Sequence, residues 1–80
     1  MTHDEIKAVI LKHMEFAVDG VSASEVYVSK SMKDYGASSL DIVSVVSSSM
    51  REMQIKIPRP KLKDIQTIGE LVDAFEKHAG

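Results

Sequence analysis

The sequence contains no cysteine and no tryptophan, and aromatic residues make up only 5% of the chain. The absence of cysteine excludes a disulfide framework, a cysteine-ligated metal and a thiol nucleophile of the chain's own. Any sulfur chemistry would therefore need a thiol borrowed from elsewhere. The scarcity of aromatic residues argues against a surface on which nucleic-acid bases stack.

Neither the charge nor the hydropathy of the chain points to a nucleic acid or a membrane as partner. The formal net charge is −2, so the basic excess that neutralises phosphates is missing. No apolar run approaches the roughly 20 residues that a membrane span requires, and the N-terminal "MTHDE" is polar, unlike a secretion signal. We therefore expect a cytoplasmic protein that binds neither nucleic acid nor membrane.

The size of the chain argues against a self-contained enzyme. Residues 1–80 are expected to form a single small domain, and a domain of this size buries only about 60% of its unfolded surface. The three histidines, His3, His13 and His78, are scattered, and His13 lies on the apolar side of a predicted helix, where we interpret it as structural. No group of potential ligands recurs at metal-binding spacing. We predict neither a catalytic residue nor a bound metal.

The first half of the chain predicts one helix and a long loop. The helix starts at a capping box formed by Thr2 and Glu5 and ends near Gly20. Residues 21–36 lack a helical pattern, and we interpret them as an ordered loop. The side chains of this loop that are expected to turn inward are Val26, Val28, Met32 and Tyr35.

The second half of the chain predicts two further main helices with a short one between them. The first of these covers residues 39–53 and cannot continue through Pro58. Residues 61–65 suffice for a turn or two of helix. The last helix starts at a second capping box, Thr67 and Glu70, and carries an apolar stripe made of Ile68, Leu71, Val72 and Phe75. The predicted fold is all-α, a small bundle of three main helices plus one short helix, with a long first loop.

The helix over residues 39–53 is expected to have one apolar and one polar side. On a wheel of about 100° per residue, the core side gathers Ile42, Val43, Val46, Met50 and Met53. The polar side holds Asp41, Ser44, Ser47, Ser48 and Arg51. Leu40 falls in the middle of the polar side, and Val45 lies at its edge. Because single exposed apolar residues are common, the wheel alone leaves open whether Leu40 has a role.

Two adjacent serines, Ser38 and Ser39, stand at the start of this helix. Serine is among the best N-cap residues, and Ser38 with Asp41 forms an acceptable capping pair, so one serine is enough to cap the helix. A group esterified to the other serine would project from the helix N-terminus, where free N–H groups and the helix dipole favour a phosphate. The residues are thus compatible with a plain cap and with an attachment point.

The run "DYGASSLD", residues 34–41, resembles the modification motif of acyl carrier proteins, Asp-x-Gly-x-Asp-Ser-Leu followed by an acidic residue. The resemblance covers essentially the whole chain, including "IKIPRPKLKDI" and "TIGEL" after the motif. It implies that a phosphopantetheinyl transferase moves 4′-phosphopantetheine from coenzyme A onto the hydroxyl of Ser39. Acyl groups then travel as thioesters on this arm, and the transferase with its magnesium ion activates the nucleophile.

The resemblance also implies that partner enzymes dock on the helix over residues 39–53 and on the loop before it. The residues expected to contact them are Ser38, Leu40, Asp41, Ser44, Val45, Ser48 and Arg51. Ser38 stands where the family commonly has Asp, and the helix face lacks the acids typical of fatty-acid-synthesis carriers. A basic run follows, made of Lys56, Arg59, Lys61 and Lys63. It is either a solvated loop or, through Arg59 and Lys61, a patch for an acidic partner.

These departures favour a freestanding carrier of a polyketide or mixed polyketide–nonribosomal peptide pathway. The stretch "VVSSSMREMQIKIPRPKLKDIQTIGELVDAF" is similar to donor carriers of β-branching cassettes, which hand an acetyl group to an enzyme similar to 3-hydroxy-3-methylglutaryl synthase. Acyltransferases and ketosynthase-like enzymes are the other expected partners of a monomeric carrier. Two alternatives stay open: a peptidyl or aminoacyl carrier of nonribosomal peptide synthesis, and an unmodified helical interaction domain in which Ser39 merely caps.

Overall fold

A computed structural model describes residues 1–79, so that Gly80, the last residue of the predicted domain, lies outside the described residues. The helices are α1 (His3–Ala17), α2 (Ser39–Met53), α3 (Arg59–Leu62) and α4 (Ile68–His78), and the short 3₁₀ helices η1 (Ala23–Glu25) and η2 (Met32–Tyr35) lie between α1 and α2. No strand occurs within residues 1–79. The prediction of an all-α fold with three main helices and one short helix is confirmed.

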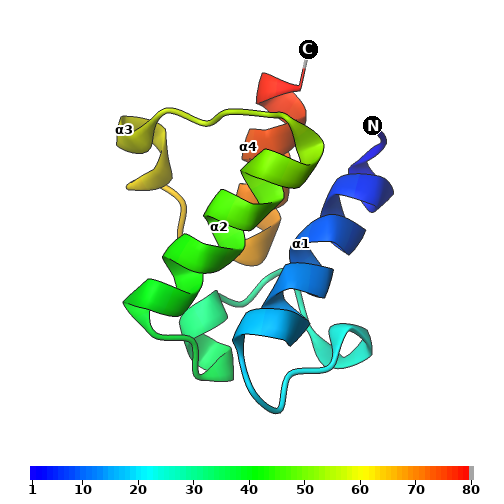
Figure 1. Ribbon diagram of the computed structural model, residues 1–80, viewed down its shortest axis with the longest axis vertical. Coiled ribbons are helices and arrows are strands. Elements are labelled where there is room, and N and C mark those ends of the chain that lie inside the picture. Colours follow the sequence, from blue (N-terminus) through cyan, green and yellow to red (C-terminus); the bar gives the residue numbers. More distant parts are fainter. Residues whose placement is uncertain (80) are drawn as a thin grey trace.

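The three long helices enclose one hydrophobic core. Figure 1 shows α1 and α2 next to each other with α4 behind them, and α3 set apart beside the C-terminal half of α2. Helix α1 packs against both α2 and α4. The largest fully buried apolar side chains are Phe75, Ile6, Ile10, Met14, Ile57, Ile68, Leu71, Val45 and Val72. Among the helices of residues 1–79, none combines the length and apolar character that crossing a membrane requires.

Both capping boxes predicted for α1 and α4 are present. The Thr2 hydroxyl accepts the N–H of Glu5 at 3.2 Å, and the Glu5 carboxylate accepts the N–H of Thr2 at 2.7 Å. Thr67 and Glu70 make the same pair of hydrogen bonds at 3.1 and 2.9 Å. The backbone N–H groups of Thr2 and Thr67 lower the pKa of the Glu5 and Glu70 carboxyls, because they stabilise the charged form. The start of each of these helices is therefore determined locally.

The long connection between α1 and α2 is ordered by contacts with the core and with α4. Val26 and Met32 are buried and Val28 and Tyr35 are partly buried, as predicted. The N–H of Gly69 donates to the carbonyl of Val28 at 2.8 Å, and that of Ile68 donates to the carbonyl of Lys30 at 3.0 Å. A Cβ at residue 69 would lie 3.2 Å from the Val28 carbonyl oxygen, which explains the glycine at this close approach.

Two valines of α2 lie on the opposite side from the one predicted. Val45 is only 1% exposed, whereas Val43 is 61% exposed, so the predicted core position of Val43 and the predicted surface position of Val45 are both wrong. The cause is Ser49, which is fully buried. Helix α1 packs against α2, and Glu52, which falls close to Val45 on the helical wheel, is the residue of α2 that contacts Lys12 and His13 of α1. Because serine is polar, hydropathy places Ser49 on the solvent side of α2. The apolar side predicted from the wheel was therefore centred too close to Val43 and too far from Val45.

One acid of α2 joins it to two bases of α1. The Glu52 carboxylate lies 2.6 Å from the Nζ of Lys12 and 2.9 Å from the Nε2 of His13. The side chain of His13 is 20% exposed, so the predicted structural role of this histidine takes the form of a hydrogen bond at the rim of the core. The three side chains close the outer edge of the α1–α2 contact.

We expect Ser49→Ala to raise the free energy of unfolding by about 1 kcal/mol, since it removes a buried hydroxyl that has no hydrogen-bond partner within residues 1–79. Ser49→Leu should instead lower it by about 1–3 kcal/mol, because the larger side chain overfills the contact with α1. Urea unfolding at neutral pH measures both changes. A destabilised Ser49→Ala variant would contradict this account of the buried serine.

The link between Glu52 and α1 should make stability depend on pH. Hydrogen bonding from Lys12, aided by His13, holds the pKa of Glu52 below its ordinary value of 4.5. The stabilisation is therefore complete above about pH 4.5 and is lost as the pH falls through the folded-state pKa. We expect the melting temperature of Glu52→Gln to lie below that of the parent at pH 7, by a small amount because the pair is exposed.

The difference between the parent and Glu52→Gln should vanish near pH 3 in thermal melts followed by circular dichroism. Glu25→Gln is the matched control, because it makes the same chemical change at an exposed acid outside the cluster. An equal deficit of Glu52→Gln at both pH values would show that the carboxylate charge does not contribute.

Candidate functional site

The motif over residues 34–41 forms the joint between η2 and α2. Helix η2 ends at Gly36, whose φ of +88° lies in the left-handed region that favours glycine. Ala37 is buried, and its N–H donates to the carbonyl of Met32 at 3.3 Å. The chain then returns to the surface at Ser38 and begins α2. The glycine turn and the buried alanine together fix the position of the first turn of α2.

The two serines at this joint are in different situations. Ser38 is the N-cap: its hydroxyl accepts the N–H of Asp41 at 3.2 Å, and the Asp41 carboxylate accepts the N–H of Ser38 at 2.9 Å. Ser39 is the first residue of α2 and is exposed. Its hydroxyl makes no hydrogen bond with the part of the chain that the structure describes. Capping is therefore the task of Ser38, and the hydroxyl of Ser39 is free.

The start of α2 suits a negatively charged group. The N–H of Ile42 donates to the carbonyl of Ser38 at 3.0 Å, and the N–H of Asp41 donates to the Ser38 hydroxyl. The N–H groups of Ser39 and Leu40 precede the first intrahelical hydrogen bond and lack such partners. Together with the helix dipole they favour a phosphate close to the Ser39 hydroxyl. The residues present therefore fit a phosphodiester at this point.

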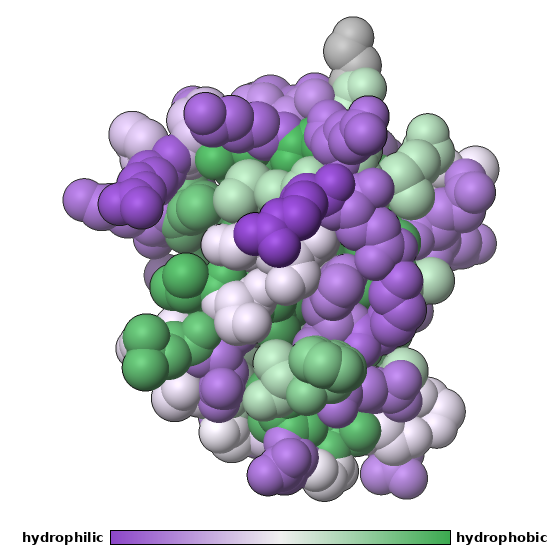
Figure 2. All heavy atoms as spheres, in the orientation of Figure 1, coloured by the Kyte–Doolittle hydropathy of each residue, from purple (hydrophilic) through white to green (hydrophobic). Residues whose placement is uncertain are grey.

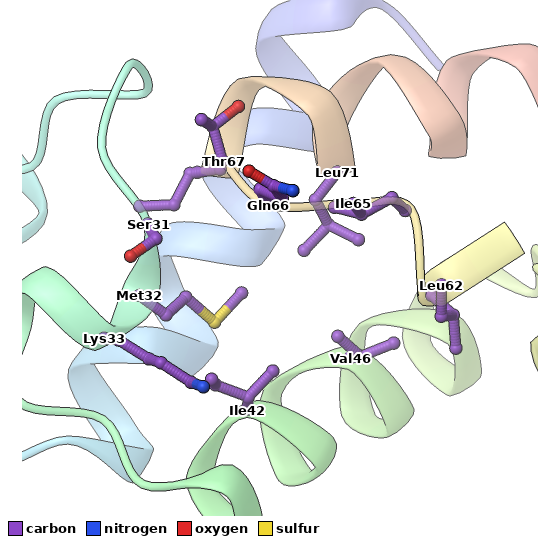
Figure 3. Close-up of a pocket in the computed structure, with 11 residues that line it drawn as sticks. Ser31, Met32, Lys33, Ile42, Val46, Leu62, Ile65, Gln66, Thr67 and Leu71 are labelled. Carbon is purple, nitrogen blue, oxygen red and sulfur yellow. The ribbon is translucent and has the colours of Figure 1, made fainter.

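A cavity of about 380 Å³ lies between α2, η2 and the segment 62–71. Figure 3 shows Ile42 and Val46 of α2 on one side of it and Ile65 and Leu71 on the other. The polar residues in its lining are Ser31, Lys33, Gln66 and Thr67. Because Ile42 follows Ser39 by less than one helical turn, the cavity is within reach of a flexible group attached to Ser39.

The residues predicted to contact partners are mostly accessible. Leu40 is 82% exposed, and Ser38, Ser44 and Arg51 are exposed as well, while Asp41 and Ser48 are half-buried. Arg59 and Lys61 are exposed on α3. Val45 is the exception, because burial in the core removes it from any docking surface.

Two exposed apolar residues were missed by the sequence reasoning. Val43 was assigned to the core, and Phe16, on α1, is 92% exposed although it lies in an amphipathic helix. Phe16 falls outside the three-and-four spacing that relates Ile6, Ile10 and Met14, and that departure was the available signal.

The structure also brings His3 close to Asp73 and Glu76, which are distant from it in sequence. All three are exposed, and their possible ligand atoms lie within 4.8 Å of one another. Nothing further in the described residues, such as a buried polar group aimed at them, marks the group as a metal site. The expectation of no bound metal stays a prediction.

Comparison with known proteins identifies the family. Residues 17–75 match the family described as phosphopantetheine attachment site. The chain belongs to the acyl carrier protein family. It is 30% identical over 73 residues to an acyl carrier protein of Sulfurovum sp. (strain NBC37-1), covering 91% of this chain and 92% of that protein. It is also 30% identical over 79 residues to an acyl carrier protein of Campylobacter jejuni (strain RM1221), covering 95% of this chain and 97% of the relative.

Membership of this family indicates the general function of the chain. An acyl carrier protein carries substrates and does not itself catalyse a reaction, and its cofactor is 4′-phosphopantetheine. Its partners are a phosphopantetheinyl transferase and acyl-handling enzymes. When bound, the cofactor supplies the thiol that this cysteine-free carrier lacks.

The division of labour between the two serines predicts different effects on stability. Ser38→Ala removes the N-cap and should lower the free energy of unfolding by about 1 kcal/mol. Ser39→Ala, the matched change one residue later, should leave it within about 0.5 kcal/mol, because the exposed hydroxyl has no partner. Urea unfolding of the unmodified variants measures both. Equal losses in the two variants would contradict the assignment of Ser38 as the cap.

Proposed function

We propose that Ser39 carries the 4′-phosphopantetheine arm and that acyl groups are transported as thioesters on its thiol. The observation that carries the proposal is the contrast at the start of α2: Ser38 is engaged in the cap, while the hydroxyl of Ser39 is exposed and free. Ser39 also precedes Leu40, in the order in which the family motif has its Ser-Leu pair.

Attachment of the arm forms one bond and breaks one bond. The Oγ of Ser39 loses its proton and bonds to the phosphorus of the pantetheine phosphate, and adenosine 3′,5′-bisphosphate leaves from coenzyme A. No base of this chain bonds to Ser39 in residues 1–79, so the transferase provides proton removal and the magnesium ion. The contribution of the carrier is to present an unhindered hydroxyl beside the free N–H groups of α2.

The cavity beside α2 is proposed to shelter the acyl group between visits to enzymes. Its apolar side chains, among them Ile42, Val46 and Leu71, favour the burial of the acyl methyl group and of methylene groups of the arm, at about 0.8 kcal/mol for each methylene. An acyl group held there is removed from water, which protects the thioester from hydrolysis. No covalent bond joins the acyl group to the residues that line the cavity. Its release therefore requires only that the arm move outward.

We propose that this carrier serves a polyketide or mixed polyketide–nonribosomal peptide pathway, as an acetyl donor to an enzyme similar to 3-hydroxy-3-methylglutaryl synthase. The support is the chemistry of the exposed surface: α2 presents serines and Arg51 in place of a row of acids, and α3 adds Arg59 and Lys61. Acyltransferases and ketosynthase-like enzymes are further proposed partners. The proposed docking residues are Ser38, Leu40, Asp41, Ser44, Ser48, Arg51, Arg59 and Lys61, without the buried Val45.

Intact mass after incubation with coenzyme A and a broad-specificity phosphopantetheinyl transferase tests the attachment. We expect the parent and Ser38→Ala each to gain the mass of one phosphopantetheine, and Ser39→Ala to gain none. Ser38→Ala is the matched control, because it removes the neighbouring hydroxyl and keeps the proposed nucleophile. A gain on Ser39→Ala would place the arm elsewhere. A parent that stays unmodified would leave Ser39 as a surface residue of a helical interaction domain.

A further inference from the structure

Three large apolar side chains stand out from the surface of α1 and α2. Phe16 of α1 is 92% exposed, and Leu40 and Val43 of α2 are 82% and 61% exposed. None of them has a place in the core or in the cavity. In Figure 2 a pale patch lies near the centre of the face, over α2, with green atoms beside and below it. Exposed apolar side chains that gather on one face in this way mark an interaction site.

The space between these apolar side chains is shallow. Ser44, Ser47 and Ser48 project small side chains from α2, and Ser48 lines a depression of about 280 Å³ together with Lys12, His13 and Phe16. Both bases of this depression are paired with Glu52, so its floor carries little free charge. We define the α1–α2 face as Phe16, Leu40, Val43, Ser44, Ser47 and Ser48.

Cations lie on the side of α2 away from α1, where Figure 1 shows α3, and on α2 itself. These are Arg51 on α2 and the basic run Lys56, Arg59, Lys61 and Lys63, all exposed, and no ion pair within the described residues includes them. The acids of α2 are occupied, since Asp41 completes the cap and Glu52 is paired with α1. Asp64 is the nearest acid in sequence to the basic run. A segment lying on this face therefore meets a positive rim.

We infer that the α1–α2 face receives an acidic amphipathic helix of a partner enzyme. Its apolar side lies over Phe16, Leu40 and Val43, and its carboxylates face Arg51 and the cations of α3. A helix suits the site better than a strand, because residues 1–79 have no sheet edge that a strand could extend. The inference rests on the proposed function, in that the partner comes to this face for the acyl group on Ser39.

The test uses two synthetic helical peptides of about 18 residues, long enough to form a helix. Both have Leu along one helical side, and the remaining positions are Glu in one peptide and Lys in the other. Each is titrated into isotope-labelled unmodified carrier and followed by NMR. We expect the Glu peptide to bind with a dissociation constant below about 1 mM, to shift the amides of residues 12–16, 40–51 and 56–63, and to weaken with added salt.

Variants of exposed residues separate the apolar part of the contact from the charged part. Phe16→Ala and Val43→Ala should each weaken the Glu peptide at least about fivefold, whereas the control Tyr27→Ala removes another exposed aromatic residue, after η1, and should change nothing. The double variant Arg59→Glu with Lys61→Glu should abolish the preference for Glu over Lys. Its control, Lys77→Glu on α4, should retain it.

Three results would overturn the inference: no binding of the Glu peptide up to about 1 mM, equal binding of the Lys peptide, or shifts confined to α4 and η1. Peptide binding does not require the arm. The mass gain at Ser39 therefore tests the proposed function independently of the peptide titration, which tests the docking helix. A mass gain without peptide binding leaves the carrier role intact and refutes the docking helix. Peptide binding without a mass gain refutes attachment alone.

Discussion

The capping box between Ser38 and Asp41 fixes the point at which α2 begins, and the rest of the site depends on that point. With Ser38 as cap, Ser39 enters the helix as its first residue with a free hydroxyl. Ile42 then lies at the cavity and Leu40 points to solvent. A helix that began one residue later would engage Ser39 in the cap and turn each following side chain by about 100°. One pair of hydrogen bonds therefore determines which serine caps the helix and which keeps a free hydroxyl.

Most of the proposed docking residues lie outside the core and the ion pairs that stabilise the carrier, and the exceptions are Ser38 and Asp41, which form the cap of α2. The charges that join α1 to α2 are paired with each other, whereas those of the basic run on and around α3 are left for solvent or a partner. Core residues of α1 and α4 are almost completely buried, while Leu40, Val43 and Phe16 contribute nothing to that core. Substitutions of these exposed side chains should therefore have little effect on folding.

The sequence predicted the helices well because their signals are local. Capping boxes at Thr2 and Thr67 and the apolar stripe of α4 depend on residues three or four positions apart, and all were found as predicted. The side of α2 that faces the core was harder to predict, because a polar residue such as Ser49 is expected at the surface although it is fully buried. A single polar residue in the core was enough to exchange the places of Val43 and Val45.

Local chemistry in the sequence thus determined the number and order of the helices, their caps, and the run from Asp34 to Asp41 in which a second serine follows the serine that caps α2. Tertiary structure alone decided which side of α2 meets α1, that Glu52 holds bases 39 and 40 residues away in the chain, and that Phe16 stays exposed. The physical reason is that capping and periodicity act within one or two helical turns. The burial of a side chain depends instead on which distant segment packs over it.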